Sequence, residues 1–401
     1  MSLLLGIDLG TSYFKVGLFD AAGVLKGLGR VAVEKDVSVP GRSELPVSRF
    51  WALLEGALAE ALAQAGAGAG EIAAVSHASQ ANSFVLLDGA DAPLTPIVLW
   101  TDARAEPLSP GLEAFSRRVE FARTVGFAGW SGGFAVAKWR WFQEHEPGLW
   151  ARVRRVLTMA DYMTFALTGQ RAGDASTASF LGLYGLARRQ WWAPALTACG
   201  VEASQLSWPV TPGTLVGRTV PQAAELLGLP AKVPFAVGGL DHHVAALGSG
   251  IGRFADVSIS TGTVLAALTL VPAAEPCAGC YHGPHFDGAR FYRLAFDPAG
   301  AGQLEEYQRQ CAWMVWKLSS RTRKRTPSRQ EAPPRSASRA RHQSNIAPNV
   351  LGRTNARFPP SRNSRANAPL LRPRCGQRDR AVRRYALISS GLQNPGTWDR
   401  L

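Results

Sequence analysis

Two short apolar runs at the start of the chain, residues 3–7 and 16–19, predict a β-hairpin. A Gly-Thr-Ser turn at residues 10–12 separates the runs. Glycine permits a sharp turn, and small hydroxyl residues leave backbone N–H groups exposed, so this turn can bind an anion such as phosphate. Asp8 ends the first run, and a carboxylate beside phosphate predicts a divalent cation between the two. The alternative is an ordinary hairpin with a surface aspartate.

Strand and helix patterns alternate along the chain to about residue 250, which predicts an α/β fold. Apolar residues at helical spacing predict a helix from its cap, Ser48, to about residue 65. The buried face of this helix is predicted to carry Trp51, Leu54, Leu58 and Leu62. Short apolar runs predict strands over residues 72–75, 84–87, 97–100 and 233–237. Further helices are predicted over residues 134–144, 156–167 and 221–228, and from Val244 onward.

A second hairpin pattern, DVSISTGTVLAALTL, spans residues 256–270. Its Ser-Thr-Gly-Thr turn at residues 260–263 resembles the first turn in composition. Two hairpins that can each hold phosphate suggest a duplicated domain with a nucleotide between its halves. Because the repeat is short, two ordinary hairpins are the alternative.

The positive charge of the chain is confined to its C-terminal part. The whole chain of 401 residues has a net charge of +14. Residues 311–401 contain 20 basic and 3 acidic residues, which leaves 24 basic and 27 acidic residues in residues 1–310. The first part is therefore a near-neutral globular protein, and any nucleic-acid binding is expected only through the basic tail.

Other features of composition indicate a soluble intracellular protein. The chain has no apolar run long enough to span a membrane and no basic segment ahead of its first apolar run, so neither a transmembrane helix nor a signal peptide is predicted. The five cysteines are few and irregularly spaced, which suits the reducing cytoplasm. They are Cys199, Cys277, Cys280, Cys311 and Cys375.

One segment has the spacing of metal ligands. It reads Cys277-x-x-Cys280-x-His282-x-x-His285, and a zinc site is one interpretation. The interpretation that we favour is a loop without a metal after the second hairpin.

Five stretches of the chain resemble, in order, the FGGY family of carbohydrate kinases, and among its members the xylulokinase type. The stretches are GIDLGTSYFKVGLFD, SQANSFVLLDGADAPLTPIVLWTDARA, MADYMTFALTGQRAGDASTAS, VPFAVGGLDHHVAALGSG and DVSISTGTVLA. The match covers about residues 3–308, and five ordered motifs are far more specific than any one alone. The resemblance implies an actin-like, ribonuclease-H-like α/β fold in two lobes, with ATP and Mg²⁺ in the cleft and the sugar on the first lobe.

The resemblance also assigns roles to individual residues. Phosphoryl transfer needs a hydroxyl nucleophile, neutralised phosphate charge and an acceptor for the hydroxyl proton. The implied general base, also in contact with substrate, is Asp241, and Asp8 would hold Mg²⁺ through water. The resemblance places near the ATP phosphates Gly10, Thr11, Ser12, Lys15, Thr261, Gly262 and Thr263. It places in the sugar site Gln80, Asn82, Trp100, Asp102 and Arg104.

An alternative for Asp241 is a purely structural one. It precedes the helix predicted from Val244, so its carboxylate could serve as the N-cap of that helix. The Gly-Gly pair before it, residues 238–239, favours a ligand site because glycine lets the backbone approach a ligand closely.

The sugar segment departs from the family pattern at one point. Many sugar kinases of this family carry Met-His after the glutamine that matches Gln80, and this chain has Ala81 and Asn82. Asparagine offers a donor and an acceptor, as neutral histidine does, so it can still hold a hydroxyl. The substrate is therefore expected among pentuloses, other ketoses and polyols.

A larger departure begins near residue 310. Residues 1–245 match the sugar-binding lobe and residues 246–310 the start of the ATP-binding lobe, whereas residues 311–401 are rich in Arg, Ser and Pro and match nothing in the family. We expect this tail to be disordered, because it cannot bury enough apolar surface to fold. The second lobe is then incomplete and lacks its adenosine-binding segment.

Two functions follow from these observations. The first is ATP-dependent phosphorylation of a sugar or polyol in carbohydrate metabolism, with little activity expected from a chain that lacks the adenosine-binding segment. The alternative is a non-catalytic sugar-binding remnant with a basic tail. A third possibility, an actin-like or chaperone-like ATPase, shares the phosphate hairpins but not the WTDAR segment. The expected partner is a small sugar or polyol and not a membrane, and the resemblance leaves room for a homodimer.

The abrupt change of composition leads to a first prediction. Either the tail is a genuine segment that binds RNA or an acidic partner, or the reading frame shifts in a GC-rich gene; the sharp boundary inside a helix pattern favours a frame shift. Resequencing across codons 300–320 is expected to show, in another frame, a continuation into a Gly-rich, helix-patterned second lobe. If no frame restores that lobe, the frame-shift explanation fails, and the tail should be tested for RNA binding.

Overall fold

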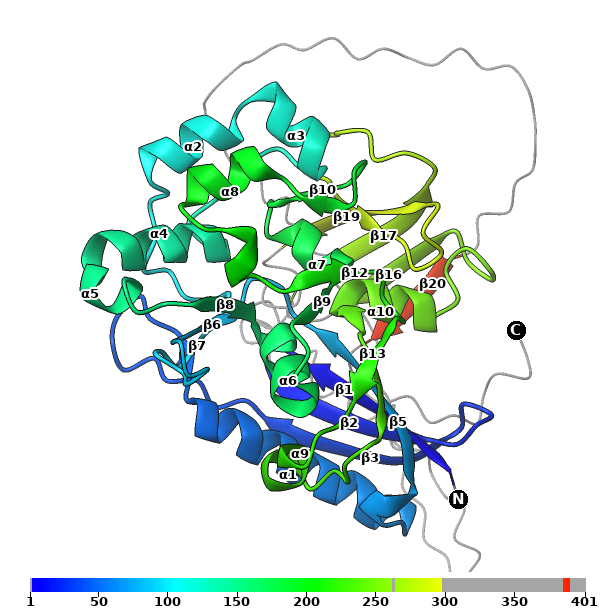
Figure 1. Ribbon diagram of the computed structural model, residues 1–401. Coiled ribbons are helices and arrows are strands. Elements are labelled where there is room, and N and C mark those ends of the chain that lie inside the picture. The colour runs from blue at the N-terminus through cyan, green and yellow to red at the C-terminus, as the bar shows by residue number, and fades with distance from the viewer. Residues whose placement is uncertain (1, 262–263, 298–384, 390–401) are drawn as a thin grey trace, which may run out of the picture. The chain divides into compact units, whose positions relative to one another are not determined.

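The computed structural model describes residues 2–261, 264–297 and 385–389 (Figure 1). The first sheet has the strand order β13-β14-β5-β1-β2-β3, with β15 also paired to β5. The predicted opening hairpin is confirmed as an antiparallel pair, and β5 runs parallel to its first strand. The strands are β1 (Leu3–Leu9), β2 (Tyr13–Phe19), β3 (Leu25–Ala32), β5 (Ile72–Ser79), β13 (Leu215–Arg218), β14 (Pro234–Ala236) and β15 (Gly239–Leu240).

Helix α1 (Val47–Ala65) packs directly on β2 and β3 (Figure 1). The approach is close because β3 carries glycine where the helix crosses it: a Cβ at Gly29 would lie 1.7 Å from the carbonyl oxygen of Ala57. The helix begins at Val47 after Pro46, so Ser48 lies inside the first turn and is not the cap. Three of the four residues predicted on its buried face, Trp51, Leu54 and Leu58, are buried, and Leu62 is half-buried.

A second layer contains a four-stranded sheet and a group of helices with an aromatic core. The sheet has the order β4-β7-β6-β8. Its strands are β4 (Glu44–Leu45), β6 (Phe84–Leu87), β7 (Ile97–Val98) and β8 (Arg155–Thr158). The helices whose residues share this core are α2 (Pro110–Ser116), α3 (Val119–Val125), α4 (Ala135–His145), α5 (Pro147–Trp150) and α8 (Ala193–Cys199).

The remaining helices and short strands join these layers. The helices are α6 (Met159–Thr168), α7 (Ala175–Phe180), α9 (Gln222–Leu227) and α10 (Asp241–Gly248). The strands form two pairs: β9 (Ala172–Asp174) pairs with β12 (Trp208–Val210), and β10 (Tyr184–Gly185) pairs with β11 (Gln190–Trp191). The helix predicted over residues 156–167 is wrong in its first turn, where the chain forms β8 and Thr158 caps α6 by accepting a hydrogen bond from the N–H of Asp161. The helix predicted from Val244 begins three residues earlier.

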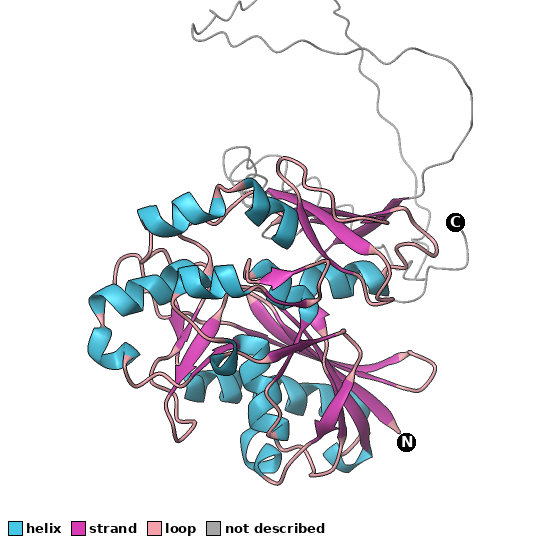
Figure 2. Ribbon diagram, turned by 45° about the horizontal axis from the view of Figure 1, so that its top comes forward, coloured by secondary structure: helices cyan, strands magenta, loops and turns pink. Residues whose placement is uncertain are grey.

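A five-stranded sheet follows α10 and repeats the connectivity of the first one. Figure 2 draws the strands of both sheets in magenta. The order of the five-stranded sheet is β18-β19-β17-β16-β20, with an antiparallel β16–β17 hairpin and a parallel partner, β20, beside β16. β16 therefore corresponds to β1 and β20 to β5, which supports the predicted duplication. The strands are β16 (Val257–Thr261), β17 (Leu265–Val271), β18 (Tyr281–Pro284), β19 (Phe291–Asp297) and β20 (Tyr385–Ser389).

The predicted disordered tail falls largely outside the described residues. Its one described segment, β20, is a strand, so the expectation of disorder fails for residues 385–389. The boundaries predicted at residues 245 and 310 stay predictions. Within the described residues, no helix is long and apolar enough to cross a membrane.

Two buried carboxyl groups lie together between α6 and α7. Asp161 and Asp174 are both buried, and a Cβ on the intervening Gly173 would lie 2.3 Å from Asp161 Oδ1. Burial raises the pKa of Asp161 to about 7, and the neighbouring Asp174 adds to the effect. Burial likewise raises the pKa of Asp174. The folded protein therefore retains a proton on this pair at a pH where the unfolded chain has released it.

This pair generates a prediction about stability and pH. Between the ordinary aspartate pKa of 3.8 and about 7, the folded state binds more protons at Asp161 than the unfolded state. The contribution of Asp161 to the free energy of unfolding is therefore largest below about pH 4 and falls as the pH rises to 7, by up to about 4 kcal/mol. Urea unfolding at several pH values should show a shallower decline for Asp161→Asn than for wild type. If the free energy of unfolding changed with pH in the same way for both proteins, the raised pKa of Asp161 would be contradicted.

Candidate active site

The register of three strands brings the predicted catalytic residues to one edge of the first sheet. Asp8 of β1 pairs with Ala78 of β5, and Ala78 pairs in turn with Gly239 of β15. Because β1, β5 and β15 run parallel, their carboxyl ends meet at this edge, where α/β proteins commonly bind ligands. Asp241 follows β15 directly, so its carboxyl group belongs to the same edge as that of Asp8.

Lys15 completes this cluster from the neighbouring strand. It lies opposite Asp8 in the β1–β2 register, and its Nζ forms an ion pair with Asp8 Oδ2 at 2.9 Å. Both side chains are about one third exposed, so a ligand can reach them. The pair therefore offers an anionic and a cationic group at the rim of the same site.

Asp241 is the first residue of α10 and is not the N-cap of that helix. The cap position belongs to Leu240, and Asp241 Oδ1 accepts a hydrogen bond of 2.7 Å from the N–H of His242. Burial raises the pKa of the Asp241 carboxyl, and the nearby Asp8 raises it further, whereas His242 and Lys15 act in the opposite direction. A carboxyl group with a raised pKa is a stronger base than an ordinary one.

The first of the two glycines that precede Asp241, Gly238, is required by close packing of the backbone. A Cβ on Gly238 would lie 1.5 Å from the carbonyl oxygen of His77 in β5. The N–H of Gly238 donates to His77 Nε2 at 3.1 Å, and burial lowers the pKa of His77 to about 4, which keeps its ring neutral and able to accept. These contacts fix the turn against β5.

A second anchor holds this turn from the side of α7. The N–H of Leu240 donates to Ser176 Oγ at 2.9 Å, and Ser176 in turn donates to Asp174. Asp174 Oδ1 also accepts from the N–H of Thr177 at 2.6 Å and so caps α7. The Asp-x-Ser stretch of the sequence thus fixes the backbone one residue ahead of Asp241, a role that the sequence alone did not indicate.

The first turn and the predicted sugar segment are joined by hydrogen bonds. The indole Nε1 of Trp100 donates to Thr11 Oγ1 at 2.8 Å, and Thr11 Oγ1 donates to Gln80 Oε1 at 3.4 Å. Gln80 Nε2 donates to the carbonyl oxygen of Gly10 at 3.1 Å. Gly10, Thr11, Gln80 and Trp100 therefore form one group, whereas Ser12 is exposed and accepts a backbone hydrogen bond from Val33.

Asn82 uses its side chain to join two backbone segments. It has a left-handed conformation with φ of 61°, and its Oδ1 accepts from the N–H of Ala135 at 3.1 Å. Its Nδ2 contacts the carbonyl oxygen of Phe180 at 3.5 Å. A sugar hydroxyl would have to use the remaining capacity of this amide, so the place of Asn82 in the sugar site stays a prediction.

Asp102 and Arg104 form a buried ion pair whose polar atoms are already engaged. Asp102 Oδ1 accepts from Arg104 Nε at 2.8 Å, and Asp102 Oδ2 accepts from the N–H of Ser43 at 2.7 Å. Arg104 also pairs with Glu44, and its guanidinium lies 5.2 Å from the ring centre of Trp141. Their side chains are at most 4% exposed. The geometry gives this pair a role in fixing the loop after Trp100.

The predicted phosphate residues of the second hairpin are only partly described. Thr261 ends β16 and pairs with Leu265 of β17, whereas Gly262 and Thr263 lie outside the described residues. The Cys/His segment was expected to be a loop, but residues Tyr281–Pro284 form β18, and both ring nitrogens of His282 have hydrogen-bond partners. Its Nδ1 donates to the carbonyl oxygen of Gly126 at 2.9 Å, and its Nε2 accepts from Arg293 at 3.1 Å. No group of three or more His, Cys, Asp or Glu residues among those described could hold a metal ion.

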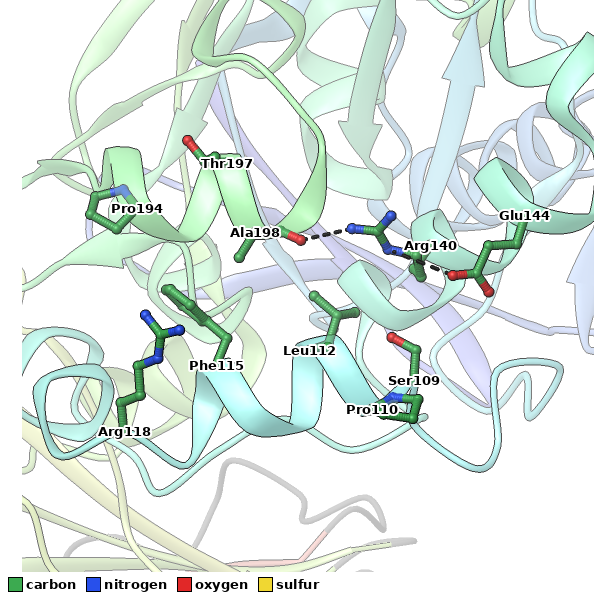
Figure 3. Close-up of a pocket in the computed structure, with 11 residues that line it drawn as sticks. Ser109, Pro110, Leu112, Phe115, Arg118, Arg140, Glu144, Pro194, Thr197 and Ala198 are labelled. Carbon is green, nitrogen blue, oxygen red and sulfur yellow. Dashed lines mark hydrogen bonds and ion pairs between the residues drawn. The ribbon is translucent and has the colours of Figure 1, made fainter.

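A groove of about 660 Å³ lies between α2, α4 and α8 (Figure 3). Arg140 spans it by donating to the carbonyl oxygen of Ala198 at 2.8 Å and approaching Glu144 at 4.0 Å. Phe115 and Leu112 supply an apolar wall. None of the lining residues is among the predicted site residues, so the groove is distinct from the Asp241 site.

Comparisons with known proteins establish the family of the chain. The model of the FGGY family of carbohydrate kinases, N-terminal domain, matches residues 3–248. The chain is 29% identical over 289 residues to "Xylulose kinase" of Lactococcus lactis subsp. lactis (strain IL1403), which covers 71% of this chain and 56% of that protein. It is 30% identical over 292 residues to "Autoinducer-2 kinase" of Escherichia coli (strain K12), which covers 70% and 54% respectively. The chain therefore spans about half the length of these relatives.

Solved structures show the same fold. A xylulose kinase from Rhodospirillum rubrum superposes with a TM-score of 0.66 at 24% identity, covering 73% of this chain and 61% of that one. A ligand-bound xylulose kinase from Lactobacillus acidophilus gives a TM-score of 0.68 at 20% identity, covering 77% and 62%. These neighbours confirm the predicted actin-like α/β sugar-kinase fold. With the family model matching well over half of its residues, the chain belongs to the FGGY family of carbohydrate kinases.

Proposed function

We propose that this protein is an ATP-dependent carbohydrate kinase that transfers the γ-phosphoryl group to a hydroxyl of a ketose or polyol. The observation that carries the proposal is the cluster of Asp8, Lys15 and Asp241 at the carboxyl ends of β1, β5 and β15. A phosphoryl transferase needs a proton acceptor for the hydroxyl and compensation of phosphate charge, and this cluster offers both.

Asp241 is the proposed general base. Its carboxylate removes the proton from the sugar hydroxyl as the new oxygen–phosphorus bond forms and the bond to the leaving ADP oxygen breaks. Its raised pKa strengthens it as a base, while the N-terminus of α10 and the N–H of His242 favour the carboxylate that must be present at the start. The anchors at Gly238 and Leu240 fix its position.

The proposed role of Asp8 and Lys15 is to compensate the negative charge of the nucleotide phosphates. Bound Mg²⁺ would neutralise charge on the nucleotide phosphates, and a single carboxylate with water is a usual way for a protein to hold this ion. The partly exposed carboxylate of Asp8 fits that requirement, because among the described residues only Lys15 Nζ contacts it at hydrogen-bond distance and that ammonium can turn toward a phosphate. The turn at residues 10–12, in which Ser12 is exposed, would offer backbone N–H groups to a phosphate.

The proposed substrate class rests on the segment from Gln80 to Trp100. Two relatives are named xylulose kinase and autoinducer-2 kinase, so ketoses are the first candidates for this chain.

A cytoplasmic location belongs to the same proposal. The described cysteines, Cys199, Cys277 and Cys280, are all free thiols, which suits a reducing compartment.

One observation favours a second candidate, a sugar-binding protein without turnover. The chain spans 56% and 54% of the two curated relatives, and the matched part contains the predicted sugar segment. Binding of a sugar without nucleotide turnover is the result that would select this candidate.

The exchange of one atom in Asp241 tests the proposal. Asp241→Asn keeps the shape and the hydrogen bond from His242 but removes the base, so sugar-dependent ADP formation should fall by about 10²–10⁴-fold. Calorimetry with a panel of ketoses and polyols, D-xylulose among them, should show that the affinity for sugar changes only a few-fold. Asp20→Asn is the matched control, since Asp20 accepts backbone hydrogen bonds from Ala22 and Val24 in the turn after β2, at the end of that strand away from the turn at residues 10–12.

Two outcomes would overturn the proposed reaction. One is wild-type ADP formation that is indifferent to every sugar in the panel, as expected of a plain ATPase. The other is an Asp241→Asn protein as active as wild type. Sugar binding by wild type without any ADP release would replace the kinase with the sugar-binding protein.

A further inference from the structure

Lys138 is a fully buried lysine at the centre of the sugar segment. It lies on α4 and has an exposed fraction of 0%. Nothing in the sequence identified it as a functional residue. Its Nζ donates to the carbonyl oxygens of Leu99, Trp100 and Gly133, each at 3.0 Å. An ammonium group has three N–H donors, so its hydrogen-bonding capacity matches these three acceptors.

Burial of this amine is unfavourable for its charged form, which argues for a specific role. Burial lowers the pKa of Lys138 to about 7, Asp102 and Glu106 act in the opposite direction, and Arg104 adds to the lowering. A buried amine is retained where its donors are satisfied, and its loss would remove one hydrogen bond from each of the three carbonyl groups, of which only that of Leu99 accepts a second hydrogen bond among the described residues, from the N–H of Asp102. An apolar side chain would fill this helix position at lower cost if packing alone were needed.

One of the residues that Lys138 contacts, Trp100, joins the sugar segment to the first phosphate turn. The carbonyl oxygen of Trp100 accepts from Lys138, its N–H donates to Ser83 Oγ at 2.9 Å, and its indole Nε1 donates to Thr11 Oγ1 at 2.8 Å. Two backbone groups of Trp100 are thus fixed, which sets the point from which its indole reaches Thr11.

The rest of α4 supports the same segment. The N–H of Ala135, at the start of the helix, donates to Asn82 Oδ1, and Trp141, near its end, lies against the guanidinium of Arg104. Lys138 stands between these two contacts. The helix therefore meets the predicted sugar residues at three successive points.

We propose that Lys138 is a positioning residue for substrate binding, which holds Trp100 so that its indole links the sugar segment to Thr11 in the phosphate turn. The inference deepens the proposed function and rests on it for the identity of the substrate. The chemical class recognised is a polyhydroxylated sugar, packed on or beside the indole face of Trp100. Lys138 itself has no contact with the reacting atoms.

The indole N–H of Trp100 provides a local readout that needs no catalysis. The protein has 12 tryptophans, and Trp100→Phe identifies the Trp100 signal in a spectrum of ¹⁵N-indole-labelled protein. In wild type this N–H should exchange slowly with water because it is bonded to Thr11. In Lys138→Met, whose side chain has similar length but no donors, exchange should be at least about tenfold faster. The indoles of Trp51 and Trp191, bonded to Tyr162 and Ser207, report the fold and should be unchanged.

A second variant keeps the inference falsifiable if Lys138→Met does not fold. Lys138→Arg retains the charge and donors but alters their geometry, so the Trp100 signal should move while those of Trp51 and Trp191 do not. A folded variant of either kind with an unchanged Trp100 signal would overturn the inference. Equal changes at all three indoles would also overturn it, because they would mean a general effect on stability.

Sugar binding separates this inference from the proposed function. With D-xylulose as the probe, calorimetry should give a dissociation constant about tenfold higher for the folded Lys138 variant than for wild type. An unchanged constant beside an altered Trp100 signal would remove Lys138 from substrate binding. Failure of the wild type to bind any sugar in the panel counts against the proposed function, while the indole measurements still decide whether Lys138 positions Trp100.

Discussion

The parallel register of β1, β5 and β15 is the constraint on which the site depends. It sets Asp8, Ala78 and Gly239 in one row across the sheet, and Asp241 then lies at the same edge as Asp8. A shift of one residue in this register would turn the Asp8 side chain to the opposite face. The glycine at 238 and the hydrogen bond to His77 secure the register of the shortest strand, which has only two residues.

Three buried polar side chains near the site are paired with backbone atoms. His77 accepts from the N–H of Gly238, Ser176 accepts from the N–H of Leu240, and Lys138 donates to three carbonyls. Each pairing fixes a short loop that carries a predicted functional residue. Side chains that would otherwise be unfavourable in a core thus hold the catalytic and sugar segments in place.

The sequence predicted the fold class and the main elements because their signals are local and ordered. The opening hairpin, the strand at residues 84–87 and the helix closed by Gly228 were all predicted correctly. Residues 156–158 were assigned to a helix because a short apolar run is compatible with either a helix or a buried strand. The five residues of β20 read Tyr-Ala-Leu-Ile-Ser, a short apolar run, and they were missed because the composition of the surrounding tail led all of it to be assigned to disorder. Their pairing with β16 depends on the sheet.

The site was predicted in part. Motifs identified Asp8, Lys15 and Asp241, and only the strand register could establish that they share one edge. The bonds of Asp102 to Ser43 and of Arg104 to Glu44 depend on contacts between residues far apart in sequence. Lys138 was missed because a lysine on a helix is usually exposed, and its burial follows from the loops folded around it.

The pKa of Asp241 is the most direct measure of whether the two carboxylates share one site. The carboxyl carbon of Asp241, identified by comparison with Asp241→Asn, can be titrated by ¹³C NMR in wild type and in Asp8→Asn. Burial and the charge of Asp8 predict a pKa above the ordinary 3.8 in wild type and a lower value when Asp8 is neutralised. An ordinary pKa that does not respond to Asp8→Asn would contradict the arrangement from which the catalytic proposal is built.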